Sequence, residues 1–215
     1  MPKAIDLIRR EHRDIALVIQ CFATVLREVR DGKLVPDPAL YEAIIDYMQN
    51  FPDRFHHPKE EDYLFKTLRQ RDQAAGALLD ELRAQHVAGD RSIADLRWKL
   101  EELKKDLEKG FPAFDQAATA YIESQKSHMA LEETKVMPAA QAALTEADWD
   151  VIGQAFADND DPIFGHNPQA YYDRLFSRIV ALTPEPYGLA TRKEPRPKSS
   201  EPLTPRRAAL DLHWI

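Results

Sequence analysis

The sequence predicts an all-α protein, built as an up-down-up-down four-helix bundle with additional C-terminal helices and an extended tail. Apolar residues recur at steps of three and four along four long stretches, which is the period of amphipathic helices. Only seven glycines occur, and runs of β-branched residues are scarce, which argues against an all-β fold. Short connections between the long stretches favour antiparallel neighbouring helices, as in a bundle.

Glycine and proline separate and bend the four predicted helices. The first should end near Gly32, because glycine adopts the left-handed conformation of a helix C-terminal cap. Pro52 and Pro58 lie inside the second helix and should bend it, because proline has no amide donor. We expect the break between the third and fourth helices at Gly110–Pro112. The predicted bundle helices cover residues 5–30, 38–68, 74–108 and 114–144.

The composition changes after the bundle. Thr145 and Asp148 have the spacing of a capping box that opens a short helix to about Phe156, and a further helix is predicted over residues 168–182. Beyond that point prolines alternate with Lys, Arg and Ser, which is typical of an extended or disordered tail. The predicted organisation is a bundle at 1–145, a helical extension at 146–182 and a tail at 183–215.

Charge and cysteine content exclude several classes of function. The formal net charge is −7, so no basic surplus exists to neutralise the phosphates of a nucleic acid. No apolar run reaches the length of a membrane span, and the N-terminal residues lack the apolar core of a signal peptide. The single cysteine, Cys21, cannot form an internal disulfide. We therefore expect a cytoplasmic protein that binds neither nucleic acid nor membrane.

A His-x-x-x-Glu-Glu pattern occurs twice, at His56–Glu61 and at His128–Glu133. Residues four apart on a helix lie on the same face, so an imidazole and a carboxylate in this spacing can bind one metal ion. His57 with Glu61 is a competing register of the first copy. We prefer His56 with Glu60, because its flanking residues align with those of His128 and Glu132.

In an antiparallel bundle, residues equidistant from a connection lie at the same height. By this measure one layer contains all of the candidate metal ligands: His12, His56, Glu60, His86, His128 and Glu132. Buried imidazoles and carboxylates are costly without a partner. Six ligands are too many for one tetrahedral zinc ion, but they suit two iron or manganese ions bridged by the two glutamates. Such a centre has open positions for dioxygen or nitric oxide.

Over residues 5–145 these motifs resemble the hemerythrin-like family, also called the HHE cation-binding domain. The words that carry the resemblance are Glu11-His12, His56-His57-Pro58-Lys59-Glu60-Glu61-Asp62-Tyr63-Leu64-Phe65, His86, and His128-Met129-Ala130-Leu131-Glu132-Glu133. The resemblance implies a four-helix bundle with a non-haem di-iron centre of the Fe–O–Fe type, for which manganese or zinc can substitute. It also implies that Glu60 and Glu132 bridge the two irons.

The sequence departs from the family pattern at two places. Oxygen-carrying members have a further histidine four residues after the one on the third helix, where this chain has Asp90. The ligand set is therefore four histidines and two glutamates, unless His57, Glu61 or Asp90 joins it. The iron–sulfur repair branch has an N-terminal cysteine pair, and this chain has only Cys21. We expect Glu11, Glu61 and Glu133 to orient ligand histidines.

The leading functional hypothesis is a di-iron protein that binds or senses dioxygen, nitric oxide or redox state. Its expected partner is a small diatomic or anionic molecule of the azide type. A binding role is favoured over an enzyme, and no catalytic residue is predicted. The alternatives are a di-iron oxidase, an iron donor in stress repair, or a helical scaffold. A homodimer or a protein partner is expected to use the C-terminal extension.

Overall fold

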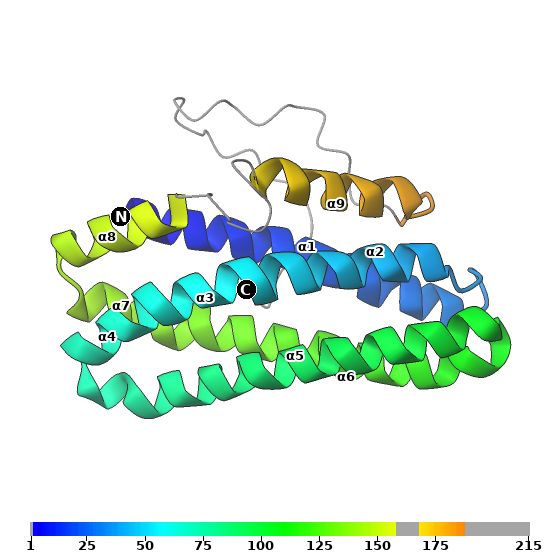
Figure 1. Ribbon diagram of the computed structural model, residues 1–215, viewed down its shortest axis with the longest axis horizontal. Coiled ribbons are helices and arrows are strands. Elements are labelled where there is room, and N and C mark those ends of the chain that lie inside the picture. Colours follow the sequence, from blue (N-terminus) through cyan, green and yellow to red (C-terminus); the bar gives the residue numbers. More distant parts are fainter. Residues whose placement is uncertain (1, 158–167, 188–215) are drawn as a thin grey trace.

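The computed structural model describes residues 2–157 and 168–187, and within this part of the chain all regular structure is helical. Four antiparallel rods form an elongated bundle, and two further helices lie on its outside (Figure 1). The first rod is α1 (Lys3–Arg30), and the third is α5 (Gly76–Lys105). The second consists of α2 (Pro38–Met48), η1 (Gln49–His56), α3 (His57–Lys59), η2 (Glu60–Phe65) and α4 (Lys66–Arg71). The fourth consists of α6 (Leu107–Leu131), η4 (Glu132–Val136) and α7 (Met137–Ala143).

The predicted bundle is confirmed, with one boundary corrected. Gly110 and Pro112 do not break the chain, because both lie inside the first turns of α6. The break is at Asp106, which has extended backbone angles and whose side chain accepts a hydrogen bond from the amide of Lys109. A Cβ at Gly110 would lie 2.5 Å from the Cα of Leu103. Glycine at this position therefore allows α5 and α6 to approach closely where the hairpin turns.

Other local predictions agree with the structure. Gly32 has a φ of 71° and follows the end of α1, as expected for a helix cap. Thr145 and Asp148 exchange hydrogen bonds between side chain and backbone, and they open α8 (Glu146–Ala157) as a capping box. The helix α8 packs against α1, while α9 (Pro168–Leu182) packs against α2. Residues 158–167, which connect α8 to α9, and residues 188–215 of the predicted tail lie outside the described residues.

The second and fourth rods each widen into π-helical turns. These turns are η1, η2 and η4, and they contain His56, Glu60 and Glu132 respectively. Pro52 and Pro58 lie in or beside them, and Pro138 follows η4. Turns of the i→i+5 type occur frequently at functional sites. The irregular stretches of both rods therefore coincide with the His-x-x-x-Glu motifs.

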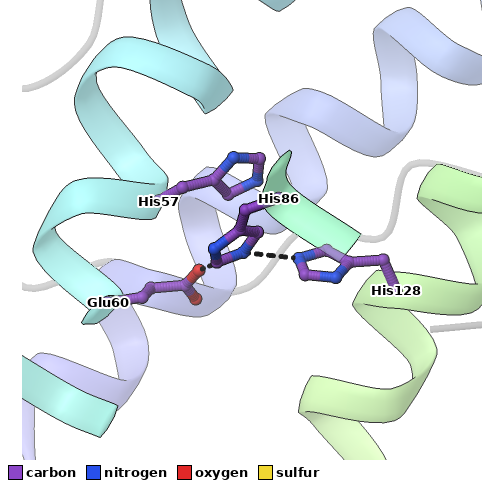
Figure 2. A group of neighbouring side chains, drawn as sticks. All are labelled: His57, Glu60, His86 and His128. Carbon is purple, nitrogen blue, oxygen red and sulfur yellow. Dashed lines mark hydrogen bonds and ion pairs between the residues drawn. The ribbon is translucent and has the colours of Figure 1, made fainter. Parts of the chain in front are cut away.

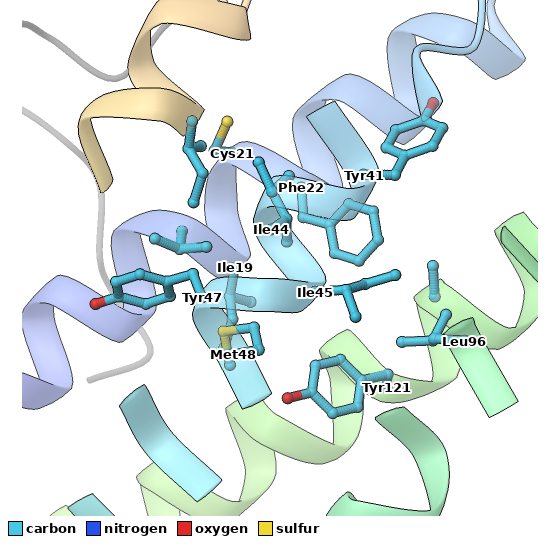
Figure 3. Close-up of a cluster of buried hydrophobic side chains, with 14 of the residues drawn as sticks. Ile19, Cys21, Phe22, Tyr41, Ile44, Ile45, Tyr47, Met48, Leu96 and Tyr121 are labelled. Carbon is cyan, nitrogen blue, oxygen red and sulfur yellow. The ribbon is translucent and has the colours of Figure 1, made fainter. Parts of the chain in front are cut away.

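Two apolar clusters stabilise the bundle, one on each side of these turns. The larger contains Phe22, Tyr41 and Phe114, whose rings lie 4.8–6.1 Å apart, and the underside of α9 (Figure 3 shows part of it). Cys21 is buried in this cluster, with its Sγ 3.3 Å from the Oγ1 of Thr183. The smaller cluster contains the start of α1, the end of the second rod and α8. No helix in the described part of the chain is sufficiently long and apolar to cross a membrane.

Candidate metal centre

A buried layer of histidines and glutamates lies between the two apolar clusters. All six residues predicted from the sequence belong to it, and none of their side chains is more than 8% exposed. The layer receives side chains from all four rods: His12, His56, Glu60, His86, His128 and Glu132. The antiparallel arrangement therefore brings together residues that are up to 120 positions apart, from His12 to Glu132.

One end of the layer, the two-histidine half, is formed by His12 and His56. Their ring centroids are 4.9 Å apart. The Nε2 atoms of both rings lie close to Glu60 Oε1, at 3.4 Å from His12 and 3.3 Å from His56. Phe156 and Phe51 lie beside His56, with ring centroids 6.0 and 6.4 Å away. This half is thus enclosed on that side by aromatic rings.

The other end, the three-histidine half, is formed by His57, His86 and His128 (Figure 2). His57 stacks on His86 with a centroid distance of 4.1 Å, and the Nε2 atoms of His86 and His128 are 3.1 Å apart. We did not include His57 in the preferred ligand set, because one step along an α-helix turns a side chain by about 100°. In the structure His56 and His57 are both buried in the layer, at the junction of η1 and α3, where π-helical turns interrupt the regular α-helix.

Glu60 and Glu132 lie between the two halves. Glu60 Oε1 faces His12 and His56, while its Oε2 is 3.9 Å from His86 Nε2. Glu132 Oε2 is 3.5 Å from His12 Nε2, and its Oε1 is 3.2 Å from His128 Nε2. Each carboxylate therefore offers one oxygen to each half, which is the arrangement expected of a bridging ligand.

Each histidine also meets a polar partner on its outer side, through Nδ1. Carboxylates partner four of the rings: Glu133 at 2.9 Å from His12, Glu11 at 2.7 Å from His56, Glu61 at 2.8 Å from His86, and Asp53 at 3.6 Å from His57. The amide oxygen of Gln85 is 3.0 Å from His128 Nδ1. Partners of this kind fix the orientation of an imidazole and direct its other nitrogen toward a metal.

The expected orienting role fits the positions of Glu11, Glu61 and Glu133, whereas Asp53 and Gln85 were missed. Asp53 lies four residues before His57, so the helical spacing of these two residues was a usable signal. No sequence pattern relates Gln85 to His128, because the contact joins α5 to α6. Asp90 is exposed and lies outside the cluster of ligand atoms. His166 and His213 lie outside the described residues.

The histidines of the layer differ in protonation, and the difference does not simply follow the two halves, because Glu132 raises the pKa of His128 against the effect of burial. For His12, burial lowers the pKa, but the hydrogen bond with Glu133 and the nearby carboxylate of Glu60 outweigh burial and raise the pKa to about 9. Burial also lowers the pKa of His56, and Glu60 and Glu11 raise it well above its ordinary value. Burial and the neighbouring rings of His86 and His128 hold the pKa of His57 well below its ordinary value. At neutral pH the metal-free two-histidine half therefore carries protons, while His57 is uncharged.

Several buried polar atoms that face the middle of the layer make no hydrogen bond. They are the Nε2 atoms of His12 and His56, Oε2 of Glu60 and both carboxylate oxygens of Glu132. A buried polar atom without a partner is costly. Metal coordination satisfies such atoms, and imidazole with carboxylate suits iron, manganese or zinc. The donor set therefore fits bound metal ions.

The charges around the layer also favour cations. Six carboxylates lie in it or contact its histidines: Glu11, Asp53, Glu60, Glu61, Glu132 and Glu133. Two of them pair with an arginine, Glu133 with Arg9 and Glu61 with Arg83. Negative groups thus outnumber these arginines, and a bound cation would offset the excess.

Comparison with known proteins agrees with this site. The family model "Hemerythrin HHE cation binding domain" matches residues 3–140, which contain the whole layer. Curated relatives titled as uncharacterized proteins occur in Mycobacterium bovis and Mycobacterium tuberculosis, and they are 28% identical over 173 residues. The match covers 74% of this chain but only 61% of the length of these relatives. No solved structure gives a significant match to the chain.

Proposed function

The chain belongs to the hemerythrin HHE cation-binding family, and on this premise we propose that it holds two iron ions in the buried layer. The observation that carries the proposal is a set of buried atoms that face the middle of the layer, could bind metal and have no hydrogen-bond partner. They belong to His12, His56, Glu60 and Glu132. Two groups of potential ligand atoms, with Glu60 common to both, support two ions and not one. Manganese or zinc are the substitutes that this donor set would accept.

The proposed ligands divide between the two halves. His12 and His56 would hold one ion, and His57, His86 and His128 would hold the other. Glu60 and Glu132 would bridge the ions, because each presents one oxygen to each half. Under this assignment His57 supplies the fifth imidazole that the sequence lacks at Asp90.

The unequal number of histidines suggests where a small ligand binds. The two-histidine half has four protein donors and the three-histidine half has five, when both glutamates are counted in each. When bound, a pair of iron ions supplies redox chemistry and an open coordination position. Phe51 and Phe156 beside His56 exclude water from the side with fewer donors. An apolar diatomic such as dioxygen or nitric oxide suits this environment, and we propose that binding or sensing of such a molecule is the function.

Elemental analysis of the purified full-length chain together with its absorption spectrum tests this proposal. We expect about two irons per chain and, after exposure to air or azide, a charge-transfer band in the visible or near-ultraviolet region. A protein that takes up iron anaerobically and then stays colourless in air and azide would contradict the proposed ligand chemistry. A protein that takes up no iron, manganese or zinc would contradict the metal site itself.

Three expectations from the sequence remain predictions. They are the cytoplasmic location, a homodimer, and a protein partner bound through the C-terminal extension. The relatives are longer than the matched region, so activities of any further segment in those proteins do not bear on this chain.

A further inference from the structure

A funnel between α5 and α6, with serine and glutamine side chains in its lining, reaches the three-histidine half from the surface. It has a volume of about 290 Å³, and His86 and His128 form its floor. Its walls carry three serines and two amides: Ser92, Ser124, Ser127, Gln85 and Gln125. Ser124 and Ser127 are exposed at the mouth, whereas Gln125 is only 5% exposed. The lining thus extends from exposed serines to the buried rings.

The lining suits a hydrated cation. It has hydroxyl and amide oxygens, and it contains no lysine or arginine. Six water molecules at about 30 Å³ each occupy about 180 Å³, which is less than the funnel volume. A divalent ion loses its water reluctantly, and side-chain oxygens can replace the waters one at a time. The funnel therefore offers an ion a path with polar side chains to the first histidines of the layer.

Amide side chains line the funnel beside the histidine rings. The Gln125 amide lies against α5 at Gly89, where a Cβ would be in ordinary van der Waals contact with its Nε2, at 3.4 Å. Gln85, which contacts His128 Nδ1, also lines the funnel. An arriving ion thus meets amide groups directly beside the rings.

The two-histidine half is more deeply buried than His86. His12 and His56 are at most 1% exposed, whereas His86 is 8% exposed. Phe51 and Phe156 lie on the side of His56 that would have to open. Apolar surroundings of this kind admit a neutral diatomic molecule far more readily than an ion, because a charge is costly to bury.

We propose that the α5–α6 funnel is the route by which divalent metal ions, ferrous iron above all, enter and leave the buried layer. The inference rests on the proposed metal centre and assigns Ser92, Ser124 and Gln125 to metal exchange. Ions would then reach the three-histidine half first, and a small gas would reach the two-histidine half by a separate, apolar path.

Ser92→Leu tests the route. The Ser92 hydroxyl donates to the carbonyl of Ala88 on its own helix, so the substitution removes no hydrogen bond between helices. Apo protein is mixed with ferrous ion under anaerobic conditions, and loaded protein is mixed separately with an excess of a ferrous chelator. We expect loading and extraction to slow by the same factor, about tenfold, which corresponds to about 1.4 kcal/mol of added barrier. The final iron content and the affinity should not change, because a blocked path affects both directions equally.

Ser177→Leu on α9 is the matched control, because Ser177 is also bonded to its own helix and is exposed. If Ser92→Leu does not fold, Ser124→Leu at the mouth replaces it, since the Ser124 hydroxyl donates to Tyr121 of the same helix. Unchanged rates in a folded variant would overturn the route while leaving the metal centre intact. A slower reaction with nitric oxide at unchanged iron loading would also overturn it. A wild-type chain that takes up no metal would instead refute the proposed function, and the route with it.

Discussion

The two halves of the buried layer share Glu60 and Glu132, yet they differ in donors, charge and surroundings. The two-histidine half is enclosed, and its rings carry protons in the metal-free protein. The three-histidine half lies at the base of the α5–α6 funnel, and its His57 is uncharged, although the pKa of its His128 is raised. Under our proposals this difference separates two tasks within one layer of ligands: the half beside the funnel would exchange ions, and the enclosed half would keep a coordination position for a small molecule.

Glu60→Ala should disrupt metal binding in both halves, because Glu60 offers an oxygen to each half. We expect the variant to lose both ions, so that iron falls from about two per chain to nearly none. Elemental analysis after anaerobic loading measures the effect, and circular dichroism checks that the variant is helical. Asp62→Ala is the control, since Asp62 is exposed in the same π-helical turn. Two retained ions in folded Glu60→Ala protein would show that this carboxylate is no bridge.

His57→Ala should affect only one half. We expect one ion to remain, held by His12, His56 and the two glutamates, because His12 and His56 lie outside the group of ligand atoms that contains His57. Asp90→Ala should retain both ions, since Asp90 is exposed and outside the cluster. Iron counting on the two variants side by side decides which residue is the fifth donor. The opposite pattern, with loss in Asp90→Ala and none in His57→Ala, would exclude His57.

The carboxylates that contact the outer nitrogen of a histidine should affect the metal affinity of one half only. Glu11→Gln removes the charged partner of His56, and Glu61→Gln removes that of His86. Substitutions of this kind typically weaken metal affinity by about 10–100-fold. Competition with a chromophoric chelator should show that each variant binds one of its two ions more weakly and the other as wild type does. Exposed Glu108→Gln should behave as wild type. Equal weakening of both ions by either substitution would argue against two distinct halves.

Metal binding should release protons from the two-histidine half. The pKa of His12 is raised to about 9, so below that pH a metal must displace its proton, and affinity falls as pH falls. Above pH 9 this release should cease. His57, with its lowered pKa, should release none near neutral pH. Calorimetry of zinc binding at pH 7 in buffers of different ionisation enthalpy counts the protons. For the ion in the two-histidine half, we expect wild type and His57→Ala to release the same number of protons. No proton release from either protein would contradict the raised pKa of His12.

Sequence periodicity was sufficient for the bundle and for the height of the layer. The repeated His-x-x-x-Glu spacing placed His56, Glu60, His128 and Glu132 on inward faces, and symmetry about the connections added His12 and His86. The predicted height of the layer was correct although the connection between the third and fourth rods lies at Asp106 and not at Gly110. Each residue adds only about 1.5 Å of height along a helix. The long side chains of histidine and glutamate can span the displacement that a shift of a few residues causes.

What the sequence did not reveal depends on deviations from regular helix geometry and on contacts between rods. His57 enters the layer beside two π-helical turns, whereas regular helical spacing assigns it to another face. Gln85 meets His128 across two helices, which no local pattern encodes. The funnel depends on small residues of α5 and α6 facing one another, so its existence follows only from the packed structure.

Anomalous diffraction at the iron edge from crystals of the loaded protein tests the central claim most directly. Two peaks should appear, about 3.5–4 Å apart as in other two-metal sites. One should lie between the Nε2 atoms of His12 and His56, and the other among His57, His86 and His128. A single peak, or peaks bound elsewhere on the chain, would contradict a pair of ions bridged by Glu60 and Glu132.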